Sequence, residues 1–239
     1  MDAQYRKQLV EECARLGIGL SGQQSDALIR YTRAVLDANE ITNLTRIVDM
    51  RQAVHLHLVD SLSAIPELRS AQEGPLLDLG SGGGFPGVPL AIGSGRATVL
   101  LDSVKKKMAA VAAAIAVLSL GAQVQTVDVR AEEHALACPS GYAAVVARAV
   151  APIASLVELA APLLQQDGLF VAMKGEPSDE EVRRGREAAR IVGLEEVSIR
   201  RFGLPIGLEA RTIVTYRRAR GPSIALPRRP GLAQHQPLA

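Results

Sequence analysis

The chain has 239 residues, 48% of them hydrophobic, which is enough for one sizeable α/β domain with an appendage. The longest uncharged apolar run, residues 108–118, is too short for a membrane-spanning helix of about 20 residues, and residues 1–15 lack the apolar core of a secretory signal. We therefore expect a cytoplasmic protein without membrane association. Cys13 and Cys138 have no second Cys or His at ligand spacing, so we expect no metal site, and the net charge of the whole chain is only +2.

The first 66 residues predict a helical cap. Apolar residues recur there at steps of three and four, as at Leu28, Tyr31 and Val35. Ser25 with Asp26 is the expected N-cap of a helix that runs to residue 37, and Pro66 is expected to close the last helix. A polar linker at residues 70–74 follows, so we place the cap at residues 1–73.

A glycine-rich turn follows the first predicted strand, residues 75–79, and opens a helix. Glycine at positions 80, 82, 83 and 84 allows positive φ and a close approach of bare backbone to a ligand. Asp78 places an acid at the strand end, which disfavours a pyrophosphate but favours the cationic ammonium and sulfonium of S-adenosylmethionine. The turn therefore predicts an S-adenosylmethionine site that includes Asp78, Gly80, Gly82 and Gly84.

A dinucleotide site is the alternative. Residues 82–87 also satisfy G-x-G-x-x-G, and Asp102 follows Gly82 at about the 20-residue distance of a ribose-binding acid. The turn begins at Gly80, however, so the dinucleotide fingerprint would start two residues late, with Pro86 in its second variable position. A nicotinamide-dependent oxidoreductase is the function that this alternative implies.

Strand and helix patterns alternate after the linker, which predicts a doubly wound parallel sheet with helices on both faces at residues 74–219. The strands are expected at residues 75–79, 98–102, 124–129, 143–147 and 169–173, and the helices between them at 103–120 and 153–164. A charged helix at 178–192 and two strand-like runs at 195–200 and 211–216 follow. Residues 220–239 are rich in proline and arginine and are expected to be extended or disordered unless RNA or the body of the protein holds them.

Polar residues stand where four of these strands end, and ligands bind at that edge of such sheets. Asp102 is expected to accept hydrogen bonds from ribose hydroxyls, and the alternative, a helix N-terminal acid, does not exclude this role. Backbone amides near Glu132 could contact adenine, or Glu132 could be an ordinary first-turn acid. Arg148 and Lys174 predict a cationic rim, and the alternatives are a structural ion pair and a solvated side chain.

Charge in the last part of the chain is strongly positive. Residues 200–229 hold eight arginines and one acid, Glu209. Such a run is either a solvated tail or an RNA contact.

Several motifs together resemble the glucose-inhibited division protein B family, the ribosomal RNA small subunit methyltransferase G family, over nearly the full length of the chain. They are Asn43-Leu44-Thr45, His57-Leu58-Val59-Asp60-Ser61, residues 78–87, Leu101-Asp102-Ser103, Arg130-Ala131-Glu132-Glu133, Ala147-Arg148-Ala149, Lys174-Gly175 and Pro227-Arg228-Arg229-Pro230-Gly231. The resemblance implies a class I S-adenosylmethionine-dependent methyltransferase, with a Rossmann-like sheet and an N-terminal helical cap, that methylates guanine N7 in 16S rRNA of the small ribosomal subunit.

The resemblance also implies the site residues. Gly80, Phe85, Ala131, Glu132 and Arg148 are expected to contact S-adenosylmethionine, with Asp78 and Asp102 in support. Arg148 and Lys174 are the expected catalytic residues, Arg148 as an orienting group and Lys174, with the basic tail, as an RNA contact. Attack by N7 needs no general base. We expect a monomer, and a non-catalytic rRNA assembly factor is a further alternative.

Overall fold

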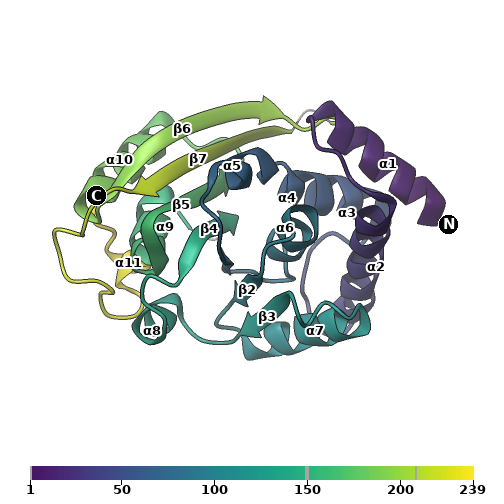
Figure 1. Ribbon diagram of the computed structural model, residues 1–239, viewed down its shortest axis with the longest axis horizontal. Helices are drawn as coiled ribbons and strands as arrows, with labels where there is room; N and C mark the ends of the chain where they lie inside the picture. Colours follow the sequence, from purple (N-terminus) through teal and green to yellow (C-terminus); the bar gives the residue numbers. More distant parts are fainter. Residues whose placement is uncertain (1, 149–150, 208) are drawn as a thin grey trace.

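The computed structural model describes residues 2–148, 151–207 and 209–239. A seven-stranded sheet in the order β3-β2-β1-β4-β5-β7-β6 forms its centre (Figure 1). The strands are β1 (Leu76–Leu79), β2 (Thr98–Leu101), β3 (Val124–Val127), β4 (Tyr142–Arg148), β5 (Leu164–Lys174), β6 (Leu194–Gly203) and β7 (Ala210–Arg218).

The first five strands are parallel, as predicted, and the chain order reverses between β1 and β4. The sheet is not parallel throughout, because β7 pairs antiparallel with both β5 and β6. The connection from β6 to β7 is too short for a crossover, so the two strands form a hairpin. The start of β7 consequently lies at the same edge as the carboxyl ends of β1 to β5.

Helices cover both faces of this sheet, as expected of a doubly wound fold. After the cap come α6 (Gly87–Ser94), α7 (Lys105–Val117), α8 (Ala131–Ala137), α9 (Ile153–Ala160), a short 3₁₀ turn η2 (Ala161–Leu163), α10 (Asp179–Ile191) and α11 (Leu232–His235). Side chains of β4 alternate between two buried apolar clusters, Val146 in one and Val145 in the other. One cluster contains the cap, α6 and α7, and the other contains α9 and α10.

The cap is helical, as predicted, but two of its helix ends differ from the prediction. It comprises α1 (Asp2–Arg15), α2 (Gly22–Asn39), α3 (Met50–Ala53), a π-helical turn η1 (Val54–Val59), α4 (Asp60–Leu62) and α5 (Ile65–Ser70). Ser21, not Ser25, caps α2, through a reciprocal pair of hydrogen bonds with Gln24. Pro66 lies in the first turn of α5 and therefore opens that helix, where a missing N–H costs nothing.

The end of the α9 region also differs from the prediction. The expected helix over 153–164 stops at Ala160, since Pro162 is accommodated only in the 3₁₀ turn that follows. β5 then begins at Leu164, five residues before the expected start at 169, and its pairing with β4 shifts register between Tyr142 and Ala144. No helix in the described part of the chain is long and apolar enough to cross a membrane.

The tail is held by the body of the protein, which was one of the two expectations for it. Figure 1 shows it as the yellow segment at the end of the molecule opposite the N-terminus, with α11 beside α9 and α8. Ala233 of α11 is 1% exposed and belongs to the same apolar cluster as α9.

Candidate active site

The glycine-rich turn after β1 is shaped by two close contacts. Gly84 has φ +80°, and a Cβ there would lie 2.0 Å from the hydroxyl oxygen of Tyr31, so only glycine fits. That hydroxyl donates to the carbonyl of Gly83 at 2.9 Å. The cap helix α2 therefore supports the turn directly.

Asp78 lies beneath the turn and is fully buried. Its Oδ2 accepts hydrogen bonds from the Gly87 amide at 2.8 Å and the Ser81 hydroxyl at 2.6 Å, while Oδ1 has no partner among the described residues. Burial raises the pKa of Asp78 to about 6, against the opposing effect of these hydrogen bonds. Negative charge under the turn disfavours a phosphate above it and favours a cationic group.

A cavity of about 270 Å³ lies over the carboxyl ends of β1, β2 and β3, and we call it the β2 cavity. Four of the predicted cofactor residues line it: Gly80, Asp102, Ala131 and Glu132. The apolar side chains of Leu79, Leu101 and Leu159 also line it, and so do the basic side chains of Lys107 and Arg130. An apolar wall with a few polar groups is typical of a small-molecule site.

Asp102 has a position and a bonding capacity that suit ribose. Its Oδ2 accepts from the Gly82 amide and its Oδ1 from the Val104 amide, both at 2.9 Å. Each carboxylate oxygen has a second lone pair, so Asp102 can still accept one hydrogen bond from each of two hydroxyls. These contacts also make it a helix N-terminal acid, so the two interpretations of Asp102 are compatible.

Glu132 joins the β2 cavity to the tail. It is 8% exposed, and its Oε1 accepts a hydrogen bond from the Gly231 amide at 2.8 Å. The glutamate is therefore more than a first-turn acid of α8. Gln234, three residues beyond Gly231, lines the same cavity.

A second cavity, of about 340 Å³, lies over β4, β5 and the start of β7, and we call it the β4 cavity. Arg148 and Lys174 line it together with Arg211. Arg148 donates to Oδ2 of Asp60 at 3.0 Å, and Arg211 donates to Oδ1 of the same carboxylate at 2.9 Å. Lys174 pairs with Glu181 at 2.9 Å. Three cations thus gather at this cavity, and Asp60 orients two of them.

His57 also lines the β4 cavity. Its ring stacks on Phe85 with centroids 4.5 Å apart and planes 9° from parallel, and its Nε2 lies 2.7 Å from the Thr45 hydroxyl. Burial, followed by the nearby charge of Arg148, lowers the pKa of His57 to about 3. The imidazole is neutral at physiological pH and is a very weak base.

Six of the predicted site residues line one of the two cavities, and the other four lie in or beneath the turn after β1. Gly80, Asp102, Ala131 and Glu132 line the β2 cavity, whereas Arg148 and Lys174 line the β4 cavity. Asp78, Gly84 and Phe85 are buried around the turn, and the Gly82 amide contacts Asp102. Ala149, beside Arg148 in its motif, and Val150 lie outside the described residues.

Three site residues escaped the sequence analysis as individual residues: Asp60, Arg211 and Gln234. An acid in the apolar stretch Leu58-Val59-Asp60 was a usable signal, because a buried carboxylate requires a partner. Arg211 counted only as part of the basic run, and nothing around Gln234 distinguishes it. Among the described residues, no cluster of three or more His, Cys, Asp or Glu side chains is placed to hold a metal ion.

The chain is similar to proteins of one family. A family model described as rRNA small subunit methyltransferase G, GidB, matches residues 24–212. The ribosomal RNA small subunit methyltransferase G of Deinococcus radiodurans is 39% identical over 223 residues, which cover 90% of this chain and 85% of that protein. The protein of the same name from Desulfitobacterium hafniense is 35% identical over 227 residues, 94% of this chain and 93% of that one.

Solved structures support the fold. A geranyl diphosphate C-methyltransferase from Streptomyces coelicolor, in complex with S-adenosyl-L-homocysteine, superposes with a TM-score of 0.56 at 14% identity over 73% of this chain and 85% of that one. An S-adenosylmethionine-dependent methyltransferase from Leishmania major superposes with a TM-score of 0.57 at 16% identity, over 78% of this chain and 82% of that one. At these identities the likeness concerns the fold, which is that of class I methyltransferases.

Proposed function

The chain belongs to the GidB family of rRNA small subunit methyltransferases, and on that premise we propose that it transfers a methyl group from S-adenosylmethionine to N7 of a guanine in 16S rRNA. One observation supports this most strongly. The β2 cavity and the β4 cavity lie on either side of the β1 turn, at one edge of the sheet, and the first contains Asp102, which suits ribose, whereas the second contains three cations.

We propose that the β2 cavity holds the cofactor. Asp102 would accept the ribose hydroxyls, Gly80 would lie against the sugar, and Ala131 with Glu132 would lie at the adenine end. The negative charge of Asp78 beneath the turn suits the cationic amino acid part of S-adenosylmethionine, which supplies an electrophilic methyl group when bound. It opposes the pyrophosphate of a nicotinamide cofactor, so we favour a methyltransferase over an oxidoreductase.

We propose that the β4 cavity receives the target nucleotide. Arg148, Arg211 and Lys174 would neutralise phosphates while the guanine leaves its stack to enter the cleft. Guanine N7 has a free lone pair, so no proton has to be removed before attack. The low pKa of His57 agrees with a reaction that uses no general base. Positioning of N7 against the methyl group is then the main catalytic contribution.

On this substrate the enzyme would act in the cytoplasm, and we propose that it does so as a monomer. Light scattering of the purified protein tests the second point, and a mass near 25.3 kDa is expected. A mass twice as large would contradict it.

The test of the function is transfer of a labelled methyl group from S-adenosylmethionine to 16S rRNA and to small subunits that lack the modification. Label on one guanine N7 is the expected result. Tight RNA binding without label on either substrate would instead favour a non-catalytic assembly factor, and binding of a nicotinamide cofactor in place of S-adenosylmethionine would favour the oxidoreductase.

A further inference from the structure

We propose that residues 226–236, the C-terminal segment, form a wall of the cofactor cavity and that Gln234 recognises the adenine base. The inference rests on the proposed function insofar as the β2 cavity binds S-adenosylmethionine. It assigns part of the tail to the cofactor, although the basic composition of the tail suggests RNA.

The segment is held to the body by an ion pair between Arg228, which is half-buried, and a buried acid. Arg228 donates through Nε and Nη2 to the two carboxylate oxygens of Glu158 on α9, at 2.7 and 2.6 Å. The side chain of Glu158 is 3% exposed. Nη2 of Arg228 also donates to the Gln236 carbonyl at 2.8 Å, which ties both ends of the segment to one guanidinium. A bidentate arginine–carboxylate pair fixes orientation as well as position.

A second attachment lies at the cavity itself. The Gly231 amide donates to Glu132, a residue of the cavity wall, at 2.8 Å. Gly231 has φ +87° and precedes α11, whose Ala233 is buried against α9. These contacts place Gln234, the residue after Ala233, in the wall of the β2 cavity.

The order of groups along the sheet edge indicates what Gln234 meets. Gly80 follows β1, Asp102 follows β2, and Ala131 with Glu132 follows β3. If Asp102 binds ribose, the base extends toward β3, where Glu132 and Gln234 lie.

The chemistry of Gln234 suits that base. Among the described residues that line the cavity, Gln234 is the only one with an amide side chain. Adenine presents an amino donor beside a ring nitrogen acceptor, which an amide matches with one acceptor and one donor. The acids and bases of the same wall offer only acceptors or only donors.

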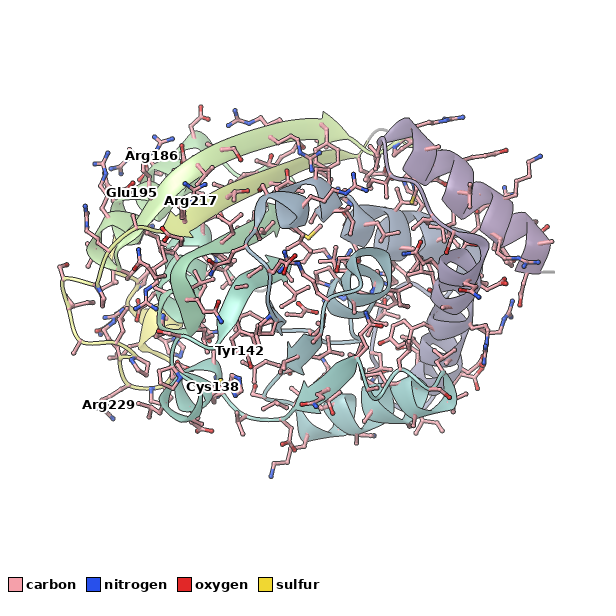
Figure 2. The ribbon with its side chains drawn as sticks, in the orientation of Figure 1. Cys138, Tyr142, Arg186, Glu195, Arg217 and Arg229 are labelled. Atoms are coloured by element: carbon pink, nitrogen blue, oxygen red, sulfur yellow. The ribbon has the colours of Figure 1, made fainter. Side chains whose placement is uncertain are left out.

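The neighbouring arginine provides a matched control. Arg229 is exposed, and Figure 2 shows it at the outer edge of the tail, whereas Arg228 pairs with Glu158. The two residues have the same side chain and adjacent positions, but only Arg228 holds the segment against the cavity.

Titration calorimetry tests the inference with two probes, S-adenosylhomocysteine and its purine analogue, which lacks the 6-amino group. The wild-type protein should prefer the adenine compound by about two- to tenfold, the range of one net hydrogen bond. Gln234→Ala should weaken S-adenosylhomocysteine binding by a similar factor and reduce that preference by at least half. Arg228→Ala should weaken both probes at least tenfold, and Arg229→Ala should change neither.

Several outcomes would overturn the inference. An unchanged preference in Gln234→Ala would show that Gln234 does not contact the amino group, and unchanged affinities in Arg228→Ala would show that the segment is no part of the cavity. If Arg228→Ala does not fold, the double variant Arg228→Gln, Glu158→Gln removes the buried charge with its partner and should show the same loss. Failure of the wild-type protein to bind S-adenosylhomocysteine would instead overturn the proposed function, and the adenine assignment with it.

Discussion

The imidazole of His57 lies flat on the phenyl ring of Phe85, with centroids 4.5 Å apart. The rings of Tyr31 and Phe85 also contact each other, in a T-shaped arrangement with centroids 5.5 Å apart. Through this cluster two separate parts of the cap, α2 and η1, contact the turn that follows β1. Disturbing Phe85 should therefore affect the cap and the turn together.

We expect Phe85→Ala to reduce the free energy of unfolding by about 3–5 kcal/mol, because it removes a buried aromatic ring and leaves a cavity. Phe85→Leu should cost less than half as much. Urea unfolding followed by circular dichroism measures both. A loss below 1 kcal/mol in Phe85→Ala would mean that the ring stack does not join the cap to the turn.

Asp60 is expected to be a positioning residue for methyl transfer. Asp60→Asn weakens its hold on Arg148 and Arg211, so the transfer rate should fall about a hundredfold, the effect of misplacing groups by about an ångström. Affinity for S-adenosylhomocysteine should stay the same, because Asp60 does not line the β2 cavity.

Glu67→Gln is the matched control for Asp60→Asn. Glu67 is also a buried carboxylate of the cap, paired with Arg200 at 2.7 and 2.9 Å, but it lines neither the β2 cavity nor the β4 cavity. Glu67→Gln should lower the stability of the protein and leave the rate of methyl transfer within about twofold of the wild-type rate. Equal rate losses in the two variants would indicate a general effect on the cap.

The Tyr31 hydroxyl should determine how the chain tolerates a larger residue at position 84. Gly84→Ala places a methyl group against this hydroxyl at a positive φ, so both strain and overlap reduce stability, by about 2–4 kcal/mol in total. Tyr31→Phe removes the overlapping oxygen and costs about 1 kcal/mol by itself. The double variant with both changes should therefore lose less stability than the sum of the two single losses. Thermal denaturation of the three variants measures this, and strictly additive losses would argue against the overlap.

Stability should depend on the protonation of His55. Burial lowers the pKa of His55, but hydrogen bonds to Glu209 and Glu12 outweigh burial and raise it above 6.5. The folded chain thus binds this proton more tightly, and the resulting stabilisation is complete below the unfolded pKa of about 6.5 and disappears as the pH rises through the folded pKa.

We therefore expect the gap in unfolding free energy between wild type and His55→Gln to be largest near pH 6 and to shrink toward pH 9. Denaturant titrations across that range measure the gap. The exposed His235, changed to Gln, should show no comparable trend. Arg15 and Arg51 line the same cavity as His55 and are the nearby cations. A gap that grows with pH would contradict the ion-paired state of His55.

RNA affinity should respond to the exposed arginines of the tail. Arg229→Ala should weaken rRNA binding and reduce the slope of log K against log salt by about 0.7–0.9, the value for one phosphate contact. Filter binding at several salt concentrations gives the slope. Arg183 is exposed but paired with Glu180 and Glu187, so Arg183→Ala should leave the slope unchanged. Equal slopes for wild type and Arg229→Ala would mean that Arg229 is simply solvated.

The β2 cavity, which we propose holds the cofactor, is more predictable from sequence than the β4 cavity. Gly80 and Asp102 directly follow β1 and β2, Glu132 lies in the first turn of the helix after β3, and parallel strands bring their carboxyl ends to one edge. Asp60 and Arg211 are 151 residues apart, and they meet only because the cap packs over a strand that runs antiparallel. No periodicity in a single chain encodes that meeting.

The two helix ends that were predicted wrongly in the cap differ in how readable they were from the sequence. The pattern Ser21-Gly22-Gln23-Gln24 contains the spacing of a capping box, so the start of α2 was readable and Ser25 was the wrong choice. Pro66 is different, since proline both ends helices and begins them, and only the packing of Ile65 and Leu68 into the core distinguishes the two cases.

The cap and one face of the sheet share a single apolar cluster, which includes Leu28 and Leu58 from the cap and Val146 and Val171 from β4 and β5. During synthesis the cap emerges first, roughly a hundred residues before those strands exist. Until then its apolar face can pack only on the segments that follow it directly, such as α6 and α7, and this incomplete core persists for about 5–20 seconds at elongation rates of about 5–20 residues per second. A nascent chain arrested before β5 should accordingly be a chaperone substrate and protease-sensitive throughout, including its finished N-terminal helices.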